Sequence, residues 1–380
     1  MSGTKQGLLL TGGGARAAYQ VGALKAIAEF YPRNHGTPFK VITGTSAGAI
    51  NSCAIACYAS CFRLGVKKLE YIWNNFHANQ IFQCSFNQIS RHLLLTFLSK
   101  FQSPHVARQP VSLLNNKPLY QLLDRYLDMR RIDINIQRQH LDAISITASD
   151  YNNGDSISFF QGNQQLQEWQ RARRSGLRTR LHTNHLLASS AIPLVFPCTQ
   201  IGRDFYGDGS VHQLSPLSPA IHLGAEKLLV IGAEQPPQQL KPGEVRQTPS
   251  GADIAGHLLD TIFTDTLNSD IERLTRVNET LTLTPESQQA SVQSSLNMKQ
   301  IGLFRLANEH DINAIADKYF HDLPITIRTL LRTIGVNQHS HSSITSYLMF
   351  EQNYTRELMN LGYQDVLKQE KELRTFLGIN

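Results

Sequence analysis

Ser46 stands between Gly44 and Gly48 at the spacing Gly-x-Ser-x-Gly. This spacing is typical of a nucleophile elbow, a sharp turn between a strand and a helix that presents a serine hydroxyl for attack on a carbonyl carbon. The two glycines allow the strand and the helix to approach without clashes between Cβ atoms. Since the chain has 25 glycines, a chance match is common, and an ordinary strand-to-helix turn is the alternative interpretation.

A serine nucleophile needs a general base, and the sequence offers two kinds. Asp208 stands between Gly207 and Gly209, a setting in which an aspartate also often bonds its own backbone in a tight turn. A histidine triad is the alternative, because several histidines lie near Asp208 in the sequence. We favour Asp208, since none of these histidines occurs in an equally sharp loop motif. They are His182, His185, His212 and His222.

A glycine-rich loop comprising Gly12, Gly13, Gly14, Ala15 and Arg16 follows a short apolar run and precedes a helical pattern over residues 17–30. Backbone N–H groups converge at such a helix start and bind an anion, either a phosphate or the oxyanion of a tetrahedral intermediate.

A dinucleotide site would need an acidic residue at the end of the second strand, but none occurs between Glu29 and Glu70. A Walker loop would need Gly-Lys-Ser/Thr, which is absent. An oxyanion hole facing Ser46 accounts both for the glycine-rich loop and for the serine at the end of the next strand. Arg16 would add a positive charge or orient the loop by bonding backbone carbonyls.

The elements that must position these residues alternate along the chain. Strands are expected at 7–11, 39–42, 141–148, 156–160, 198–201 and 227–233, and helices at 17–30, from 47 onward, 181–187 and 216–225. Residues 235–251 read as a proline- and glutamine-rich surface loop. Beyond this loop, helices are expected at 252–277, 303–334, 344–360 and 364–376.

Together, Gly12–Arg16, Gly44–Gly48 and Asp208-Gly209 resemble the three signature blocks of the patatin-like phospholipase family, and Ala188–Pro193 is similar to the family as well. Residues 346–351 and 361–365 resemble bacterial intracellular members. One departure is Ser210, where the family usually has glycine or alanine.

The resemblance implies a three-layer α/β fold, with a mainly parallel central sheet flanked by helices. It implies a catalytic core at 1–233, a surface loop at 234–250, and a helical C-terminal region at 251–380 that packs on the core.

The resemblance further implies a serine lipid acyl hydrolase of the phospholipase A or lysophospholipase kind. Ser46 would attack the ester carbonyl and form an acyl-enzyme, Asp208 in the loop with Gly209 would take its proton, and Gly12–Arg16 would bind the oxyanion. Neither a cofactor nor a metal is required by this logic. A catalytically inactive lipid-binding protein of the same fold is the alternative, for which Ser210 is a hint.

Composition fits a globular protein, with 41% hydrophobic residues, a formal net charge of +6 and a pI near 9.0. We find no signal-peptide pattern and no run of eighteen apolar residues, and five cysteines suit a reducing compartment. We therefore expect a cytoplasmic protein that contacts phospholipid or lysophospholipid, with peripheral contact to an anionic inner membrane surface as a further expectation. No nucleic-acid motif accompanies the basic charge, and the oligomeric state is not indicated.

Three segments invite sharper interpretations. Cys53, Cys57 and Cys61 are expected to share one buried helix face rather than bind a metal. The arginine-rich residues 171–180 are expected to form a solvated surface loop, with a phosphate-contacting patch as the alternative. Residues 84–101 are expected to form a buried helix, or else an amphipathic segment that caps the site or enters a bilayer surface.

Overall fold

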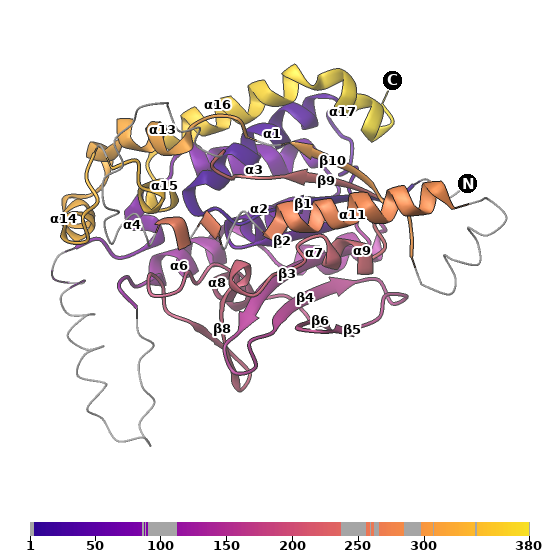
Figure 1. The fold of residues 1–380 in the computed structure, drawn as a ribbon, viewed down its shortest axis with the longest axis horizontal. Coiled ribbons are helices and arrows are strands. Elements are labelled where there is room, and N and C mark those ends of the chain that lie inside the picture. Colours follow the sequence, from indigo (N-terminus) through magenta and orange to yellow (C-terminus); the bar gives the residue numbers. More distant parts are fainter. Residues whose placement is uncertain are drawn as a thin grey trace.

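A computed structural model describes residues 4–85, 87, 89, 112–236, 256–258, 260–261, 266–284, 298–306, 308–338 and 340–379. Its centre is a largely parallel sheet between layers of helices (Figure 1). Most of the segment at 84–101, for which a buried or amphipathic helix is expected, lies outside the described residues.

Parallel strands form the core of the sheet in the order β10-β9-β1-β2-β3. Their runs are short and apolar, and most of their residues are buried, as parallel strands covered on both faces require. The bounds are β1 (Gln6–Leu10), β2 (Val41–Thr45), β3 (Ala143–Asp150), β9 (Lys227–Ile231) and β10 (Gly302–Leu306).

A mixed extension, with both antiparallel and parallel pairs, continues the sheet beyond β3. Strand β4 (Ser156–Gly162) pairs antiparallel with β3, and β6 (Arg174–Arg178) and β5 (Trp169–Arg171) follow it outward. Strand β8 (Asp204–Asp208) pairs with the last residues of β3 and, on its other side, with β7 (Thr199–Ile201). The carboxyl end of β3 therefore borders both β2 and β8.

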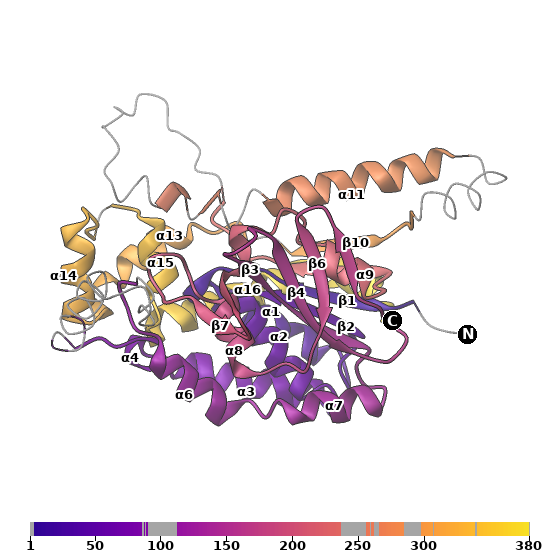
Figure 2. The ribbon, with the colours of Figure 1, turned by 90° about the horizontal axis from the view of Figure 1, so that it is seen from below.

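Two apolar cores make the fold three-layered, because alternate side chains of each strand enter opposite faces. In β1, Leu8 and Leu10 enter the larger core, whereas Leu9 enters the smaller one. The larger core is covered by α1 (Ala18–Glu29), α2 (Ala47–Cys57), α3 (Phe62–Asn74) and α16 (Gln352–Lys368), and the smaller by α9 (Ser218–His222) and α11 (Thr266–Leu283). Figure 2 shows α11 and α3 on opposite sides of the strands.

Helices α1 and α16 cross closely because each has a glycine at the contact. A Cβ atom on Gly22 would lie 1.7 Å from the carbonyl oxygen of Met359, and one on Gly362 would lie 2.1 Å from that of Tyr19. The C-terminal region is thus packed directly on the first helix of the core.

The other helices lie around these layers. They are α4 (Ala78–Ile81), α6 (Lys117–Tyr126), α7 (Arg130–Gln137), α8 (Thr183–Ser189), α13 (Ile312–Lys318), α14 (Ile325–Thr333), α15 (Ser343–Leu348) and α17 (Glu370–Leu377), with short 3-10 turns η1 (Gly14–Ala17), η2 (Gly209–Val211) and η4 (Phe320–Asp322). Within the described ranges, no helix combines the length and the apolar character that crossing a bilayer would require.

The α/β class, the largely parallel sheet and the flanking helices predicted from the sequence are confirmed. The helix expected over 303–334 is wrong at its start, because residues 302–306 form β10. The apolar run Gly302-Leu-Phe-Arg-Leu satisfies its backbone hydrogen bonds on the edge of β9 instead. The C-terminal region therefore also contributes a strand to the central sheet.

Two smaller expectations are also corrected. Helix α2 ends at Cys57, so Cys61 does not share its face but precedes α3 as its N-cap residue. The arginine-rich segment is a hairpin rather than a loop, since Arg171 pairs with Arg174 across β5 and β6.

Candidate active site

The register of β3 brings Ser46 and Asp208 to the same place. Thr45, the last residue of β2, lies beside Thr147 of β3, and the next residue of β3, Ala148, lies beside Asp208 of β8. Because Ser46 follows Thr45 directly, the two side chains expected to act together emerge at neighbouring positions at the carboxyl end of β3.

The backbone at Ser46 forms a strained elbow. Its φ of 55° and ψ of −129° lie in a region that a residue with a side chain rarely adopts. The Ser46 N–H donates to Ser189 Oγ at 2.9 Å, and that hydroxyl donates to the carbonyl of Thr147 at 2.6 Å. These bonds from a neighbouring helix hold the turn in place.

Glycine is required on both sides of this elbow. A Cβ atom on Gly44 would lie 2.5 Å from the carbonyl oxygen of Gly48, and one on Gly48 would lie 2.3 Å from that of Leu10. The strand, sharp turn and helix expected around Ser46 are therefore present, with α2 packed close against β1.

Asp208 is completely buried at the end of β8. Its Oδ1 accepts the backbone N–H of Ser210 at 3.0 Å, while Ser149 Oγ donates to its carbonyl at 2.7 Å. Its Oδ2 makes no hydrogen bond of normal geometry with any described residue. One carboxylate oxygen is thus fixed, and the other remains available to accept a proton.

Burial raises the pKa of Asp208 to about 6, and interactions with Ser46 and Ser210 offset part of this effect. The hydroxyl of Ser46 is therefore close enough to influence the carboxylate, although the two groups are not in direct hydrogen-bond contact. Catalytic hydrogen bonds are often long before substrate binds. A carboxylate with a pKa near 6 is a better base than an ordinary aspartate and is still ionised at neutral pH.

Gly209 lets Asp208 approach the end of β2. A Cβ atom on Gly209 would lie 2.1 Å from the carbonyl oxygen of Thr147 and 2.8 Å from the Thr45 side chain. Ser210, which departs from the usual family pattern, is accommodated here, and its backbone N–H orients the carboxylate.

The glycine-rich loop ends in η1, the turn that precedes α1. Gly14 has a φ of 55°, and the backbone N–H groups of Gly12, Gly13 and Gly14 donate to no other described residue. Gly14 also lines the same pocket as Ser46. The loop can therefore offer N–H donors beside the serine, as an oxyanion hole requires.

Arg16 makes contacts that were not expected from the sequence. Its side chain is completely buried and donates to side-chain oxygens of Ser346, Asp260 and Asn313, at 2.8, 3.0 and 3.0 Å. Among the described residues it bonds no backbone carbonyl, and it is not one of those that line the pocket.

An apolar pocket extends from Ser46 along α2. Its cavity volume, counted as the space that the centre of a water-sized sphere can reach, is about 50 Å³, and Ala47, Ile50 and Ala54 line it on successive turns of the helix. Its wall is almost entirely hydrocarbon. The remaining lining residues are Leu69, Ile72, Trp73, Phe76, Ile81, Leu119, Leu122, Leu123, Tyr126, Leu127, Ser190, Ile192, Phe196 and Phe350.

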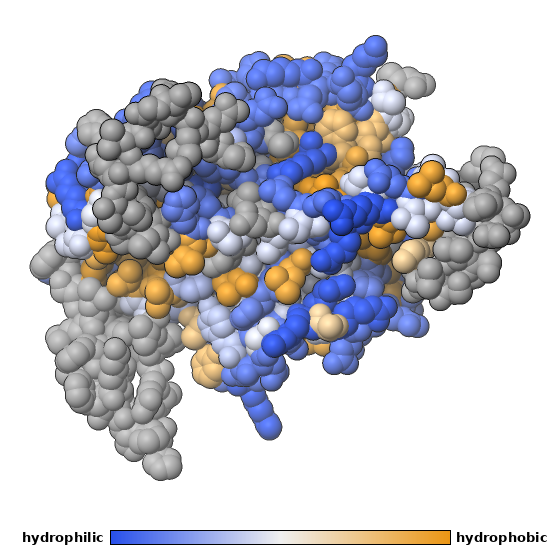
Figure 3. All heavy atoms as spheres, viewed as in Figure 1, coloured by the Kyte–Doolittle hydropathy of each residue, from blue (hydrophilic) through white to orange (hydrophobic). Residues whose placement is uncertain are grey.

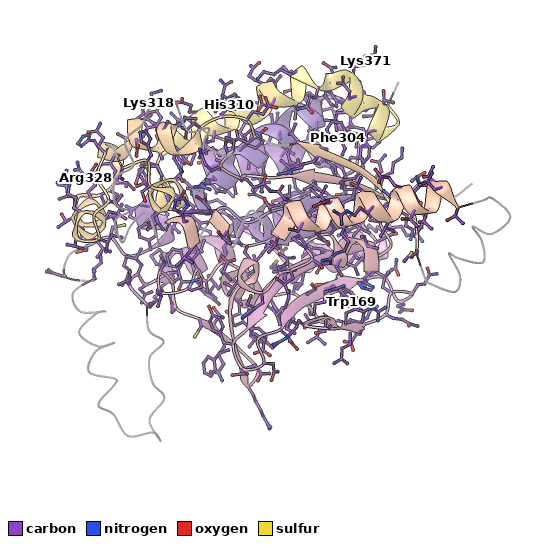
Figure 4. The ribbon with its side chains drawn as sticks, viewed as in Figure 1. Trp169, Phe304, His310, Lys318, Arg328 and Lys371 are labelled. Carbon is purple, nitrogen blue, oxygen red and sulfur yellow. The ribbon has the colours of Figure 1, made fainter. Side chains whose placement is uncertain are left out.

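Three of the candidate histidines are engaged elsewhere, and the ring Nδ1 of the fourth, His212, is buried without a hydrogen bond to any described residue. Burial lowers the pKa of His185 to about 4, and its Nδ1 accepts the backbone N–H of His182. Burial also lowers the pKa of His222 to about 4, and its ring stacks on Trp169 of β5, the last strand in the sheet order, at the lower right in Figure 4. No hydrogen bond in the described ranges joins His212 or the other three to Ser46 or Asp208, so the geometry gives no support to a triad.

Several supporting residues were not identified from the sequence. Ser189 fixes the Ser46 amide, and Gln213 joins Thr45 and Thr147 through bonds of 2.7 and 3.2 Å. The block Ala188-Ser-Ser-Ala was noticed for its resemblance only, and nothing in the local sequence marks Gln213.

The sequence profile of the patatin-like phospholipase family matches residues 8–221, which include the loop at Gly12–Arg16, Ser46 and Asp208. The chain belongs to this family. The resemblance stated from its signature blocks is therefore confirmed. A comparison with curated protein sequences gives no match.

Solved structures give weaker likenesses. The human GIVD cytosolic phospholipase A2 is 10% identical over 99% of this chain and 60% of its own, with a TM-score of 0.48. VipD from Legionella pneumophila is 11% identical over 94% of this chain and 67% of its own, with a TM-score of 0.30. ExoU from Pseudomonas aeruginosa, in complex with SpcU, is 15% identical over 96% and 73%, with a TM-score of 0.26. This patatin-like chain thus spans less than two thirds of the length of the human protein.

Proposed function

We propose that this patatin-like chain is a serine lipid acyl hydrolase that cleaves acyl esters through a dyad of Ser46 and Asp208. The observation that carries the proposal is a strained serine elbow that lies beside a buried carboxylate at the mouth of an apolar pocket. The strained backbone, the buried carboxylate and the apolar pocket each serve ester cleavage, and an ordinary strand-to-helix turn would need none of these three features. The chemistry lies within residues 1–233, and residues 251–380 support it.

In the first half of the cycle, Ser46 Oγ attacks the ester carbonyl while Asp208 Oδ2 takes the hydroxyl proton. The tetrahedral oxyanion is stabilised by N–H donors of the Gly12–Arg16 loop, where a single donor contributes about 3 kcal/mol. Asp208 then returns the proton to the leaving alcohol, and the acyl group stays on Ser46.

In the second half, water attacks the acyl-enzyme and Asp208 takes its proton. The fatty acid leaves when the tetrahedral intermediate collapses and Ser46 recovers its hydrogen. Ser46 and Asp208 carry out every proton transfer in this cycle, so it includes no cofactor.

The pocket favours a long acyl chain as the group transferred. Each methylene group of the substrate that moves from water to this hydrocarbon wall makes the free energy of binding more favourable by about 0.8 kcal/mol. A phospholipid or a lysophospholipid would place the acyl chain in the pocket and leave its head group outside.

Exposed leucines near the pocket suit contact with a lipid surface. Leu194 is 71% exposed with a φ of 64°, although its neighbours Ile192 and Phe196 line the pocket. Leu113, 40% exposed, donates its backbone N–H to the carbonyl of Leu194, and Leu214, 63% exposed, follows the Gln213 that bonds Thr45. Figure 3 shows apolar atoms at the left, in the centre and at the right of this face, whereas polar atoms cover the top.

Cations at the same end of the sheet favour an anionic lipid surface. Arg174 lies beside Ser156 of β4, which pairs with Ser149 near the end of β3, and exposed Arg173 precedes it. The five cysteines are all free thiols, which agrees with a reducing interior. We therefore propose a cytoplasmic protein with peripheral contact to the inner membrane surface.

The test is hydrolysis of a short-chain p-nitrophenyl ester and of a panel of phospholipids and lysophospholipids, with and without a chelator. We expect wild-type turnover that survives chelation and is lost in both Ser46→Ala and Asp208→Asn. Activity of Asp208→Asn near the wild-type rate would refute the dyad. Lipid binding by a folded wild type that turns over no ester, and whose Ser46 resists a fluorophosphonate probe, would establish the inactive binding protein instead.

A further inference from the structure

Arg16 joins the catalytic loop to residues far outside the span that matches the family. Its Nε donates to Ser346, and its two terminal nitrogens donate to Asp260 and Asn313. Its guanidinium also lies 4.0 Å from the centre of the Tyr347 ring. With Ser343, these four residues form a group that we call the arginine dock.

The dock is itself a connected hydrogen-bond network. Ser346 Oγ lies 2.8 Å from Asn313 Oδ1, Asn313 Nδ2 donates to Ser343 Oγ at 3.0 Å, and Ser343 Oγ donates to Asp260. Asn313, Ser343, Ser346 and Tyr347 are each at most 6% exposed. A network satisfied in this way holds its members in one arrangement.

The backbone of the loop touches the dock as well. A Cβ atom on Gly14 would lie 2.4 Å from the carbonyl oxygen of Tyr347. The loop is therefore held at two points, by the closely packed backbone at Gly14 and by the side chain of Arg16.

We propose that the arginine dock is a positioning device for the oxyanion loop, and that Arg16 serves as a positioning residue rather than as a donor to the oxyanion. This inference rests on the proposed function. Consecutive glycines give the loop little stiffness of its own, whereas oxyanion donors must be held to within about 0.5 Å. A planar guanidinium bonded to three acceptors fixes both the position and the rotation of its chain segment.

Asp260 is the position at which the dock is best tested. Its side chain is 26% exposed, so that its replacement disturbs the core less than a change at Arg16 would. Asp260→Ala removes the acceptor for Arg16 and for Ser343, whereas Asp260→Asn keeps an oxygen of the same shape. Arg16→Lys, a second variant, keeps a charge but cannot reach three acceptors at once.

Asp365→Ala is the matched control. Asp365 also belongs to the C-terminal region, its side chain is 7% exposed, and it accepts from Tyr19 of α1 at 2.9 Å and from His310 at 3.0 Å. Figure 4 shows His310 at the top of the molecule beside α16. This cluster also ties the C-terminal region to α1 but makes no contact with the loop among the described residues.

The readouts are kcat and KM for a soluble short-chain ester, the rate at which a fluorophosphonate labels Ser46, and the melting temperature. We expect Asp260→Ala to lower kcat and the labelling rate roughly 10- to 100-fold with KM little changed, because misplaced donors weaken only the transition state. Asp260→Asn should recover most of this loss. Asp365→Ala should lower the melting temperature as much or more while kcat stays near the wild-type value.

The inference fails if Asp260→Ala keeps the wild-type kcat, or if the two alanine variants lose kcat in proportion to their loss of melting temperature. It also fails if Asp260→Asn is no better than Asp260→Ala. These outcomes differ from failure of the proposed function, in which the wild type itself neither turns over an ester nor reacts with the probe.

Discussion

The pKa of Asp208 predicts how activity depends on pH. In the proposed dyad the carboxylate must be ionised to accept the proton of Ser46, and burial raises its pKa from 3.8 to about 6. With this value about 90% of the free enzyme carries an ionised base at pH 7 and about 10% at pH 5, so kcat/KM should fall about tenfold between them. An aspartate of ordinary pKa would stay ionised over the same range, and kcat/KM would hardly change.

The assay is kcat/KM for a soluble p-nitrophenyl ester from pH 4.5 to 8.5, together with the rate of Ser46 labelling by a fluorophosphonate. Using a monomeric substrate removes any effect of pH on lipid binding. Ser210→Ala provides an internal perturbation, because contacts from Ser210 lower the pKa of Asp208. Losing the hydroxyl should therefore move the acidic limb of the profile to higher pH.

A limb centred near pH 4 would refute the environment assigned to Asp208. If Asp208→Asn kept a rate comparable to that of the wild type and an acidic limb near pH 6 in its kcat/KM profile, Asp208 would not be the base, since another group would then be titrating. Replacement of His212 by asparagine controls for the triad, and should leave both the rate and the limb unchanged.

Three further predictions follow from the same geometry. Asp208→Asn should stabilise the protein by up to about 3 kcal/mol above pH 6, because the buried carboxylate charge is then absent. Since the pKa of Asp208 is raised in the folded state, the cost of burying this charge in the wild type grows as the pH rises from 3.8 to 6. The gain in melting temperature of the variant should therefore shrink toward pH 4. Ala54→Leu should fill the pocket about 10 Å beyond Ala47. For esters of long acyl chains, kcat/KM should fall about fourfold for each methylene group that the leucine excludes from the pocket, whereas a butyrate ester should react as before. A uniform loss of kcat/KM over all chain lengths would argue against this acyl pocket. Leu194→Ser should weaken binding to anionic vesicles but leave turnover of a soluble ester unchanged. The control is Leu283→Ser, which should affect neither, because Leu283 is exposed on α11 beside the amino ends of β9 and β10. Equal vesicle binding by both variants would show that Leu194 does not contact lipid.

Local features of the site were predictable because short-range chemistry dictates them. Glycines at positions 44 and 48 are needed wherever a strand turns sharply into a helix, and the carbonyls that a Cβ would strike confirm the need. The same holds for Gly209, which packs against the end of β3. Steric demands of this kind act within a few residues, so they leave a mark in the sequence.

Features that depend on distant pairing were not predictable in this way. The strand β10 was taken for part of a helix, because five residues show too little periodicity and their partner β9 lies 71 or more residues earlier. Cys61 kept the four-residue spacing of Cys53 and Cys57 although the helix had already ended. The pairing of β8 with the end of β3, which brings Asp208 to Ser46, is likewise fixed by register and not by any local motif.

The orientation of Arg16 decides how the glycine-rich loop can stabilise an oxyanion. Burial alone would lower the pKa of Arg16, but Tyr347 and Asp260 outweigh this effect and raise it, so the side chain remains a cation. That charge is paired with Asp260 at 3.0 Å, and neither residue is among the described residues that line the pocket. The paired charges largely cancel, so in the proposed mechanism we expect the backbone N–H groups of Gly12, Gly13 and Gly14 to supply the stabilisation. A loop that works through uncharged donors is suited to an oxyanion that forms during the reaction, since it does not hold a permanent anion such as a phosphate as tightly as an unpaired cation would.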